Sequence, residues 1–250
     1  MLKKRLIPQL LINGDRLIKT DKFSNPRYIG DPLNAVSIFN EKKADEIFII
    51  DINKTLLNET PDLHYIAQLA SESFMPFGYG GAINNLETAK KIFDLGVEKV
   101  ILQSSVFHNP SIITDIASIY GSQSVVISLD IKKNFLGDYF LFSKNIKIKN
   151  QNNIQEYVLK FIELGAGEIL FNSTYLESTF KGLDMNLITN IKKYCSIPLL
   201  INGGLNNLNN AKEAFKLGVD GVVAGSFFVF YGKHKAVLIS YPLEDEIYNL

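Results

Sequence analysis

The sequence predicts a (β/α)8 barrel, an α/β fold in which eight parallel strands alternate with helices. Two observations support this prediction. Short apolar runs alternate with amphipathic segments along all 250 residues. Residues also recur at a fixed offset, as Val97 and Val219 do (219 − 97 = 122). An open, doubly wound sheet gives no reason for such a repeat. We therefore expect a single domain over residues 1–250, built from half-barrels at about 1–120 and 121–242.

Each half is expected to contribute four strands. The apolar runs predict strands that begin near Lys4, Glu46, Pro76, Lys99, Ser124, Glu168, Pro198 and Gly221. Helices are expected after Asp31-Pro32, Asn84-Asn85 and Asn206-Asn207, because Asp and Asn cap helix N-termini. Another helix has its apolar stripe at Val158, Phe161 and Ile162. Glycines that follow a leucine predict helix C-caps at Gly96, Gly165 and Gly218.

Composition excludes several classes of protein. The chain has 26 Lys and Arg against 26 Asp and Glu, so no field of one sign would recruit it to nucleic acid or to an anionic membrane. Its one cysteine, Cys195, makes no intramolecular disulfide and is expected to be a buried structural thiol. The apolar run at 222–231 is too short to span a bilayer. The apolar stretch near the N-terminus is broken by Gln9 and is too short for the apolar region of a signal peptide. These features favour the cytoplasm.

Glycines and hydroxyls at the expected strand ends form two candidate phosphate cradles. The first cradle combines Gly81 with Ser104, and the second combines Gly203 and Gly204 with Gly225 and Ser226. Glycines allow backbone amides to approach an anion closely, and helix N-termini favour negative charge. The alternative is that the glycines only permit tight turns. Two such cradles would suit a substrate with a phosphate at each end. The first is the weaker one, because it lacks a counterpart of Gly225.

Asp130 is expected to end the fifth strand, 125–130, and to point toward the mouth of the barrel. A carboxylate at this end of a barrel strand is suited to general acid or base chemistry, although it also caps helices. The corresponding end of the first strand, 5–11, has no carboxylate. Lys19, farther along, is either a ligand for phosphate or simply solvated.

Charged residues stand at the starts of four expected strands, at Arg5, Glu46, Lys99 and Glu168. Two hypotheses account for them. They form a closed ring of ion pairs across the base of the barrel, or they are exposed rim charges that contribute little to stability. Spacing alone slightly favours the rim.

Several stretches resemble a known family over the whole chain. They are residues 1–8, Lys19, 30–32, 77–81, 109–114, 121–123, Asp130 and 165–170. The chain resembles HisF, the cyclase subunit of imidazole glycerol phosphate synthase. The resemblance implies a HisH-like glutaminase on the N-terminal face. It also implies ammonia that passes a charged gate and crosses the barrel to a doubly phosphorylated ribulosyl substrate, on which two aspartates act. The gate matches Arg5, Glu46, Lys99 and Glu168, so the resemblance favours the ring over rim charges.

Other positions depart from the family. One catalytic aspartate matches Asp130, but the other falls on Leu11, which transfers no proton. Gln103 replaces an asparagine, and of the acidic phosphate loop after the sixth strand only Glu177 keeps an acid, which is expected to face the substrate. Residues 225–242 resemble the WbuZ-type branch, which is associated with amidation of surface-glycan sugars and implies a sugar amidotransferase as a further partner. No cofactor is implied. His64, His108 and His234 have no ligand-like spacing, so no metal is expected.

Three functional hypotheses follow. The chain relays ammonia from its glutaminase toward a glycan amidotransferase, it is an active cyclase of histidine biosynthesis, or it is an inert scaffold that only activates the glutaminase. The intact gate beside Leu11 favours the first. The second requires Asp130 to act without its partner, and the loss of one member of an acid–base pair typically lowers a rate by about 10²–10⁴-fold.

Overall fold

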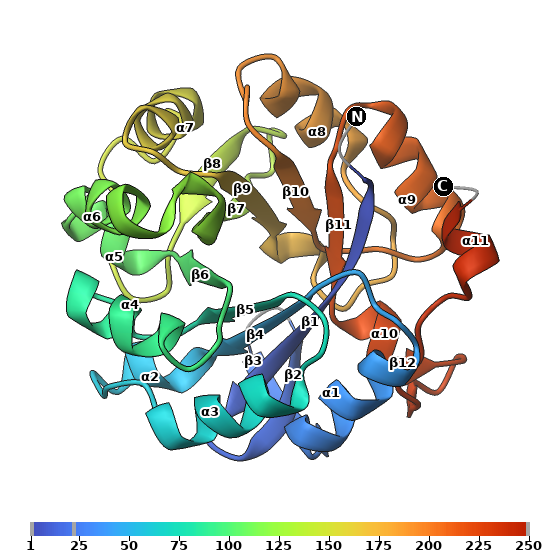
Figure 1. Cartoon of the computed structure of the whole chain (residues 1–250). Coiled ribbons are helices and arrows are strands. Elements are labelled where there is room, and N and C mark those ends of the chain that lie inside the picture. The colour runs from blue at the N-terminus through green and yellow to red at the C-terminus, as the bar shows by residue number, and fades with distance from the viewer. Residues whose placement is uncertain (1–2, 22–23, 249–250) are drawn as a thin grey trace.

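The computed structural model describes residues 3–21 and 24–248 and has the predicted (β/α)8 architecture (Figure 1). Parallel strands pair in chain order, and pairing of β1 with β11, Arg5 opposite Gly221, closes the sheet. The barrel strands are β1 (Arg5–Asn13), β4 (Ile47–Asp51), β5 (Phe77–Gly80), β6 (Lys99–Leu102), β7 (Val125–Lys133), β9 (Glu168–Ser173), β10 (Leu199–Asn202) and β11 (Gly221–Ala224). Met1 and Leu2, part of the opening motif, lie outside the described residues.

Helices surround the closed sheet on all sides of the barrel (Figure 1). The longer ones are α1 (Pro32–Glu41), α3 (Leu63–Glu72), α4 (Leu86–Phe93), α6 (Ser111–Tyr120), α7 (Ile154–Glu163), α8 (Met185–Lys192) and α9 (Leu208–Lys216). Shorter ones are α2 (Ile52–Leu56), α5 (Ser104–His108), η1 (Ser122–Ser124), η2 (Thr174–Leu176), α10 (Ser226–Val229) and α11 (Glu244–Tyr248). No helix in these ranges is both long enough and apolar enough to cross a membrane.

The repeat in the sequence recurs in the boundaries of the elements. β5 and β10 begin 122 residues apart (199 − 77 = 122), and so do α4 and α9 (208 − 86 = 122). Equivalent asparagines, Asn85 and Asn207, cap these two helices through their side-chain oxygens, as predicted. The two halves are therefore copies of one pattern of strands and helices, closed into one sheet.

Two predicted strand ends are wrong. β7 continues past Asp130 to Lys133, because the antiparallel strand β8 (Tyr139–Phe142) pairs with it. β1 likewise continues past Leu11 to Asn13, where it pairs with β2 (Arg16–Asp21), and β3 (Ser24–Gly30) then pairs with β2. A strand can extend beyond a barrel when a new partner satisfies its backbone groups. A second small hairpin joins β12 (Phe230–Tyr231) to β13 (Ala236–Val237).

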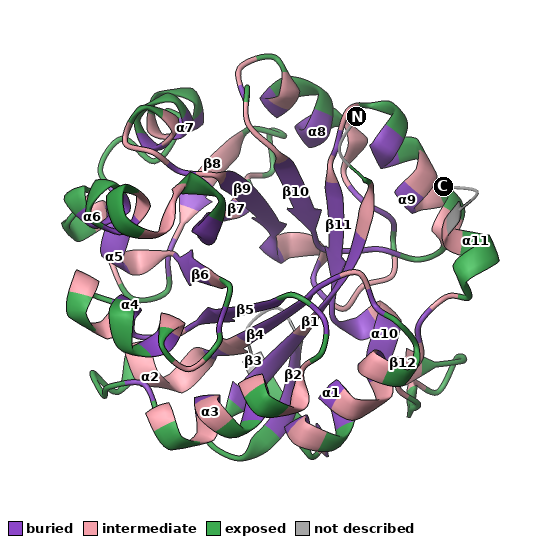
Figure 2. Cartoon of the chain, in the orientation of Figure 1, coloured by how far each residue is buried: buried purple, intermediate pink, exposed green. Residues whose placement is uncertain are grey.

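The core has two layers, and Figure 2 shows the buried strands within a ring of helices whose outer faces are exposed. The outer layer lies between the sheet and the helices, and it includes the buried, unoxidised Cys195 that was predicted. The inner layer fills the barrel with Ile7, Phe48, Ile101, Val126, Leu170, Leu200 and Val223. Gly78 makes room for Phe48, since a Cβ there would lie 2.7 Å from the ring. The inner layer separates the two ends of the barrel.

Candidate functional site

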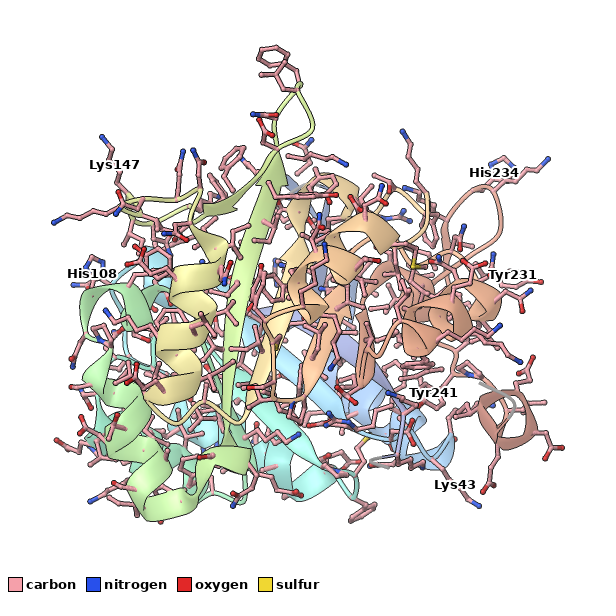
Figure 3. All side chains as sticks on the ribbon, turned by 90° about the horizontal axis from the view of Figure 1, so that it is seen from above. Lys43, His108, Lys147, Tyr231, His234 and Tyr241 are labelled. Atoms are coloured by element: carbon pink, nitrogen blue, oxygen red, sulfur yellow. The ribbon has the colours of Figure 1, made fainter. Side chains whose placement is uncertain are left out.

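The two ends of the barrel carry different groups of polar side chains. In Figure 3, Lys147 and His234 lie at the end where the β7–β8 hairpin projects, and Lys43, just before β4, lies at the opposite end. The first end is the mouth, where the barrel strands finish. The second is the base, where they begin.

At the base, the four charges predicted from the strand starts form a closed ring of ion pairs. Arg5 contacts Glu46 at 2.5 Å and Glu168 at 2.8 Å. Lys99 contacts the same two carboxylates, Glu46 at 2.6 Å and Glu168 at 3.1 Å. Each cation thus lies between two anions and each anion between two cations. The geometry supports the ring over exposed rim charges.

Burial of the ring is uneven. The side chain of Glu46 is 2% exposed and that of Glu168 is 9% exposed, whereas Arg5 and Lys99 keep 18% and 15%. Burial raises the pKa of Glu46, although Lys99 and Arg5 oppose that shift. Burial disfavours the charge of Arg5 as well, but Glu168 and Glu46 outweigh it and raise the pKa of the guanidinium. The ring is charged and costly to bury, and the two cations are its only partly accessible members.

At the mouth, the residues of the first cradle and Asp130 line one cavity of about 180 Å³. Gly81, Ser104 and Asp130 border it, together with Leu11, the position where the family's other aspartate falls. Lys144 also borders it and was not expected from the sequence. The structure therefore brings the predicted carboxylate and the first cradle together.

Amide side chains hold Asp130 in place. Asn172 donates to its Oδ1 at 2.9 Å, and Gln103 donates to its Oδ2 at 3.3 Å. Asn202 continues the chain by donating to Asn172 at 3.0 Å and to Gln9 at 3.4 Å. Asn172, Asn202 and Gln9 were not predicted as site residues. Alternation along β1 was the available signal, because it places Gln9 on the same face as Arg5 and Ile7.

Burial raises the pKa of Asp130 to about 7, against the hydrogen bond from Asn172 and with a contribution from the charge of Glu177. A carboxyl that titrates near neutrality is well suited to give or take a proton. Asp130 can therefore act as a general acid or base. Asp51 also borders the cavity, but its carboxylate accepts from the amides of Asn53 and Lys54 at the start of α2, and Leu11 supplies no carboxyl.

The glycines of both cradles have a steric role. Gly81 and Gly203 have positive φ values of 145° and 108°. A Cβ on Gly81 would lie 2.8 Å from the carbonyl oxygen of Asp51, and one on Gly203 would lie 2.5 Å from that of Ser173. Tight packing on the preceding strand therefore requires both glycines. Their role in phosphate binding stays a prediction.

The second cradle gathers around a much smaller cavity, of about 20 Å³. All its predicted residues border the space, namely Lys19, Glu177, Gly203, Gly204, Gly225 and Ser226. Lys19 and Glu177 are buried and contact each other at 3.2 Å. Lys19 is thus not simply solvated, and its partner is a carboxylate of the same chain.

The raised pKa of Asp130 predicts how stability depends on pH. Between about pH 4 and pH 7 the folded chain holds a proton on Asp130 that the unfolded chain has lost, so the free energy of unfolding falls as pH rises through this window. Asp130→Asn removes this fall in the free energy of unfolding, because the amide does not titrate. Because the cavity gives water access to the carboxyl, we expect the variant to be more stable than the wild type by about 1–2 kcal/mol at pH 8.

The two proteins are expected to be equally stable at pH 4. Urea denaturation at pH 4, 6 and 8 measures the difference, with Asp115→Asn, on an exposed helix position, as the matched control. A pH-independent gap between Asp130→Asn and the wild type would contradict the assignment.

Comparisons with known proteins point to one family. The family model described as histidine biosynthesis protein matches residues 5–235. The chain is 45% identical to a putative HisF subunit of imidazole glycerol phosphate synthase from Leptospira interrogans, over 98% of both chains. It is 44% identical to a putative subunit of the same synthase from Pseudomonas aeruginosa, over 97% of both. A HisF subunit from Dictyoglomus turgidum is 33% identical over 92% of this chain and 91% of its own. The chain therefore belongs to the HisF family of histidine biosynthesis proteins.

Proposed function

We propose that the chain is the synthase subunit of a glutamine amidotransferase complex and receives ammonia through its barrel from a HisH-like glutaminase. The observation that carries this proposal is the closed ring of Arg5, Glu46, Lys99 and Glu168 at the base. A buried ring of this kind contributes little net stability, because desolvation offsets the attraction between its charges. A role in the passage of ammonia through the base explains why the barrel has this ring.

Ammonia in its neutral form is the species suited to this route. Beyond the ring it meets the apolar inner layer, which includes Ile7, Phe48 and Leu170. An ammonium ion would be strongly disfavoured there, whereas neutral ammonia loses much less on leaving water. The amides around Asp130 follow at the mouth and offer hydrogen-bonding partners. In this proposal the ring admits ammonia and Lys99, on a flexible stem, is the side chain that moves.

For the acceptor, we propose a surface-glycan sugar, amidated by a separate sugar amidotransferase to which the ammonia is passed. Leu11 supports this choice, since it leaves Asp130 as the one carboxyl of the predicted pair in the mouth cavity. The second candidate is the cyclase reaction of histidine biosynthesis, which the names of the relatives favour. The third, an inert scaffold, needs neither the ring nor Asp130.

Lys99→Met tests the gate. In an assay with a HisH-like glutaminase as the partner, we expect the variant to bind that partner normally but to stimulate glutamine hydrolysis about tenfold less, within the range for residues that couple two sites. The matched control is Lys91→Met, which removes an exposed ion pair with Glu87. Glutamate formation and the affinity of the two subunits are the measurements.

Undiminished stimulation by Lys99→Met would exclude the gate. The acceptor is tested separately by supplying the complex with ammonia and the family's ribulosyl substrate. Turnover at a rate typical of HisF would exclude the relay in favour of the cyclase. A sugar amidotransferase gene next to the gene for this chain would support the relay. A position of that gene in a histidine operon would support the cyclase.

A further inference from the structure

The C-terminal segment after β13 places one aromatic side chain, Tyr241, against the base of the barrel. In Figure 3, Tyr241 lies toward the same end as Lys43. Only 6% of the residue is exposed. Its aromatic side chain is stacked on Phe228 of α10, with 5.4 Å between the centroids, and meets Phe39 of α1 edge-on at 6.4 Å. These contacts fix the direction of the phenol, whose hydroxyl reaches β1.

The hydroxyl of Tyr241 joins the starts of two neighbouring barrel strands. It accepts a hydrogen bond from the amide of Asp45, just before β4, at 3.2 Å. It donates to the carbonyl oxygen of Leu6 in β1 at 2.9 Å, and Oδ2 of Asp45 is a second acceptor for the same proton at 3.2 Å. That carboxylate oxygen also accepts from the amide of Leu6 at 3.1 Å. Three backbone groups are therefore satisfied through one phenol and one carboxylate.

These hydrogen bonds stand beyond the end of the ladder between β1 and β4. The pairing of the two strands begins at Gln9, opposite Phe48, and runs toward the mouth. Leu6 and Asp45 have the same offset (48 − 9 = 39 and 45 − 6 = 39), but they lie three residues nearer the base. Pro8, just before the ladder, has no amide proton to contribute to it. The phenol therefore bridges the two strands where their own ladder has ended.

The bridge lies directly behind one ion pair of the ring. In β1, Leu6 directly follows Arg5, and before β4, Asp45 directly precedes Glu46. Arg5 and Glu46 contact each other at 2.5 Å. Successive side chains of a strand point to opposite faces, so Arg5 shares the inner face with Ile7 while Leu6 packs in the outer layer. The separation of the two strands at the bridge therefore sets the separation of these two charges.

The hydroxyl keeps its proton at neutral pH. Burial raises the pKa of Tyr241, and the negative charge of Asp45 raises it further. Lys3 contacts the other oxygen of Asp45 at 2.7 Å and helps to hold this carboxylate in place. A phenylalanine at position 241 would leave the carbonyl oxygen of Leu6 and the amide of Asp45 without this partner, and unsatisfied buried groups are costly.

We infer that Tyr241 is a positioning residue for the ring of Arg5, Glu46, Lys99 and Glu168. Its hydroxyl holds β1 and β4 at the separation at which Arg5 and Glu46 pair. The part of the chain that the family model matches ends at residue 235, so this contact comes from a segment beyond it. The inference deepens the proposed function by making the C-terminal segment part of the entrance for ammonia, and in that respect it rests on the proposed function.

A double-mutant cycle tests the positioning role without a partner protein. Tyr241→Phe keeps the aromatic packing and removes the hydroxyl, and it is expected to raise the equilibrium constant of unfolding about tenfold. Glu46→Ala removes the ion pair that the hydroxyl positions. In the double variant this constant should therefore rise about fivefold less than the product of the two single effects. Urea denaturation of the four proteins measures the constants.

Phe228→Leu is the matched control. It disturbs the packing around Tyr241 but leaves the hydroxyl and its hydrogen-bonding partners in place. Its effect on the equilibrium constant of unfolding should multiply with that of Glu46→Ala to within about twofold, as for independent sites.

Stimulation of a HisH-like glutaminase tests the link to the entrance. Tyr241→Phe is expected to stimulate glutamine hydrolysis about threefold less than the wild type at an unchanged affinity of the two subunits, because the pair of Arg5 and Glu46 is displaced. Phe228→Leu should stimulate the glutaminase as the wild type does, although it too loses stability. Equal losses of stimulation in the two variants would mean that Tyr241 only supports the fold.

The two measurements fail separately. Single effects of Tyr241→Phe and Glu46→Ala that multiply to within twofold would overturn the positioning role. Full stimulation by Tyr241→Phe, in an assay in which Lys99→Met lowers it, would overturn the link to the entrance. If Lys99→Met changes nothing, the proposed function fails, and the cycle still decides whether Tyr241 positions the ring.

Discussion

Glu46→Ala is expected to lower the free energy of unfolding by about 3 kcal/mol, near the lower end of the range for breaking a buried ion pair. The side chain of Glu46 is 2% exposed and contacts Arg5 at 2.5 Å and Lys99 at 2.6 Å. Without it, two cations share Glu168 alone. Their partial contact with water keeps the loss from being larger. Urea denaturation of the wild type and the variant, with equal slopes, measures the change.

The matched control is Glu244→Ala. Its partner is Lys43, at 3.9 Å, and both side chains are more than 80% exposed. An ion pair of this kind contributes about 0–1 kcal/mol, so the control should be close to the wild type. Equal losses in the two variants would mean that the ring is not the buried network described above.

Replacing all four ring residues together separates stability from function. Burial raises the pKa of Glu46, so the folded chain holds a proton on this side chain more tightly than the unfolded chain does. The free energy of unfolding therefore falls as pH rises from the pKa of Glu46 in the unfolded chain to its pKa in the folded chain. Arg5→Met, Glu46→Leu, Lys99→Met and Glu168→Leu in one chain should therefore cost little stability, because apolar side chains of similar volume remove the desolvation penalty. Stimulation of the glutaminase should nevertheless be lost.

The barrel could be predicted from the sequence because the same pattern of strands and helices occurs twice in it. Each strand and helix is signalled twice, 122 residues apart, and errors in one half are corrected by the other. The antiparallel strands β2 and β8, each of which follows the first strand of its half, were missed, and so was β3. They depend on antiparallel pairing with extensions of β1 and β7, and periodicity along one segment carries no information about its partner.

The site was predicted in parts. The starts of four strands identified the ring residues, since a barrel places all strand starts at one end. Lys19 and Glu177 were identified too, but as ligands for phosphate. Their ion pair joins residues 158 apart in the sequence, and only the closed fold places them in contact. A charged residue's sequence neighbours do not reveal whether its partner is a substrate or another side chain.

Leu11→Asp is expected to raise the rate of the cyclase reaction on the ribulosyl substrate by about 10²-fold or more over the wild type. Leu11 lines the same cavity as Asp130, so an aspartate there restores the second member of the acid–base pair. Such a group typically contributes about 10²–10⁴-fold. Imidazole glycerol phosphate formation from added ammonia is the measurement.

The matched control is Leu11→Asn, which has the same shape and polarity at position 11 but no titrating group. It should bind the ribulosyl substrate as well as Leu11→Asp does and turn it over no faster than the wild type. If the two variants had equal rates, the carboxyl at this position would not be the missing group. A gain confined to Leu11→Asp fits a mouth in which Asp130 lacks the second carboxyl of the pair.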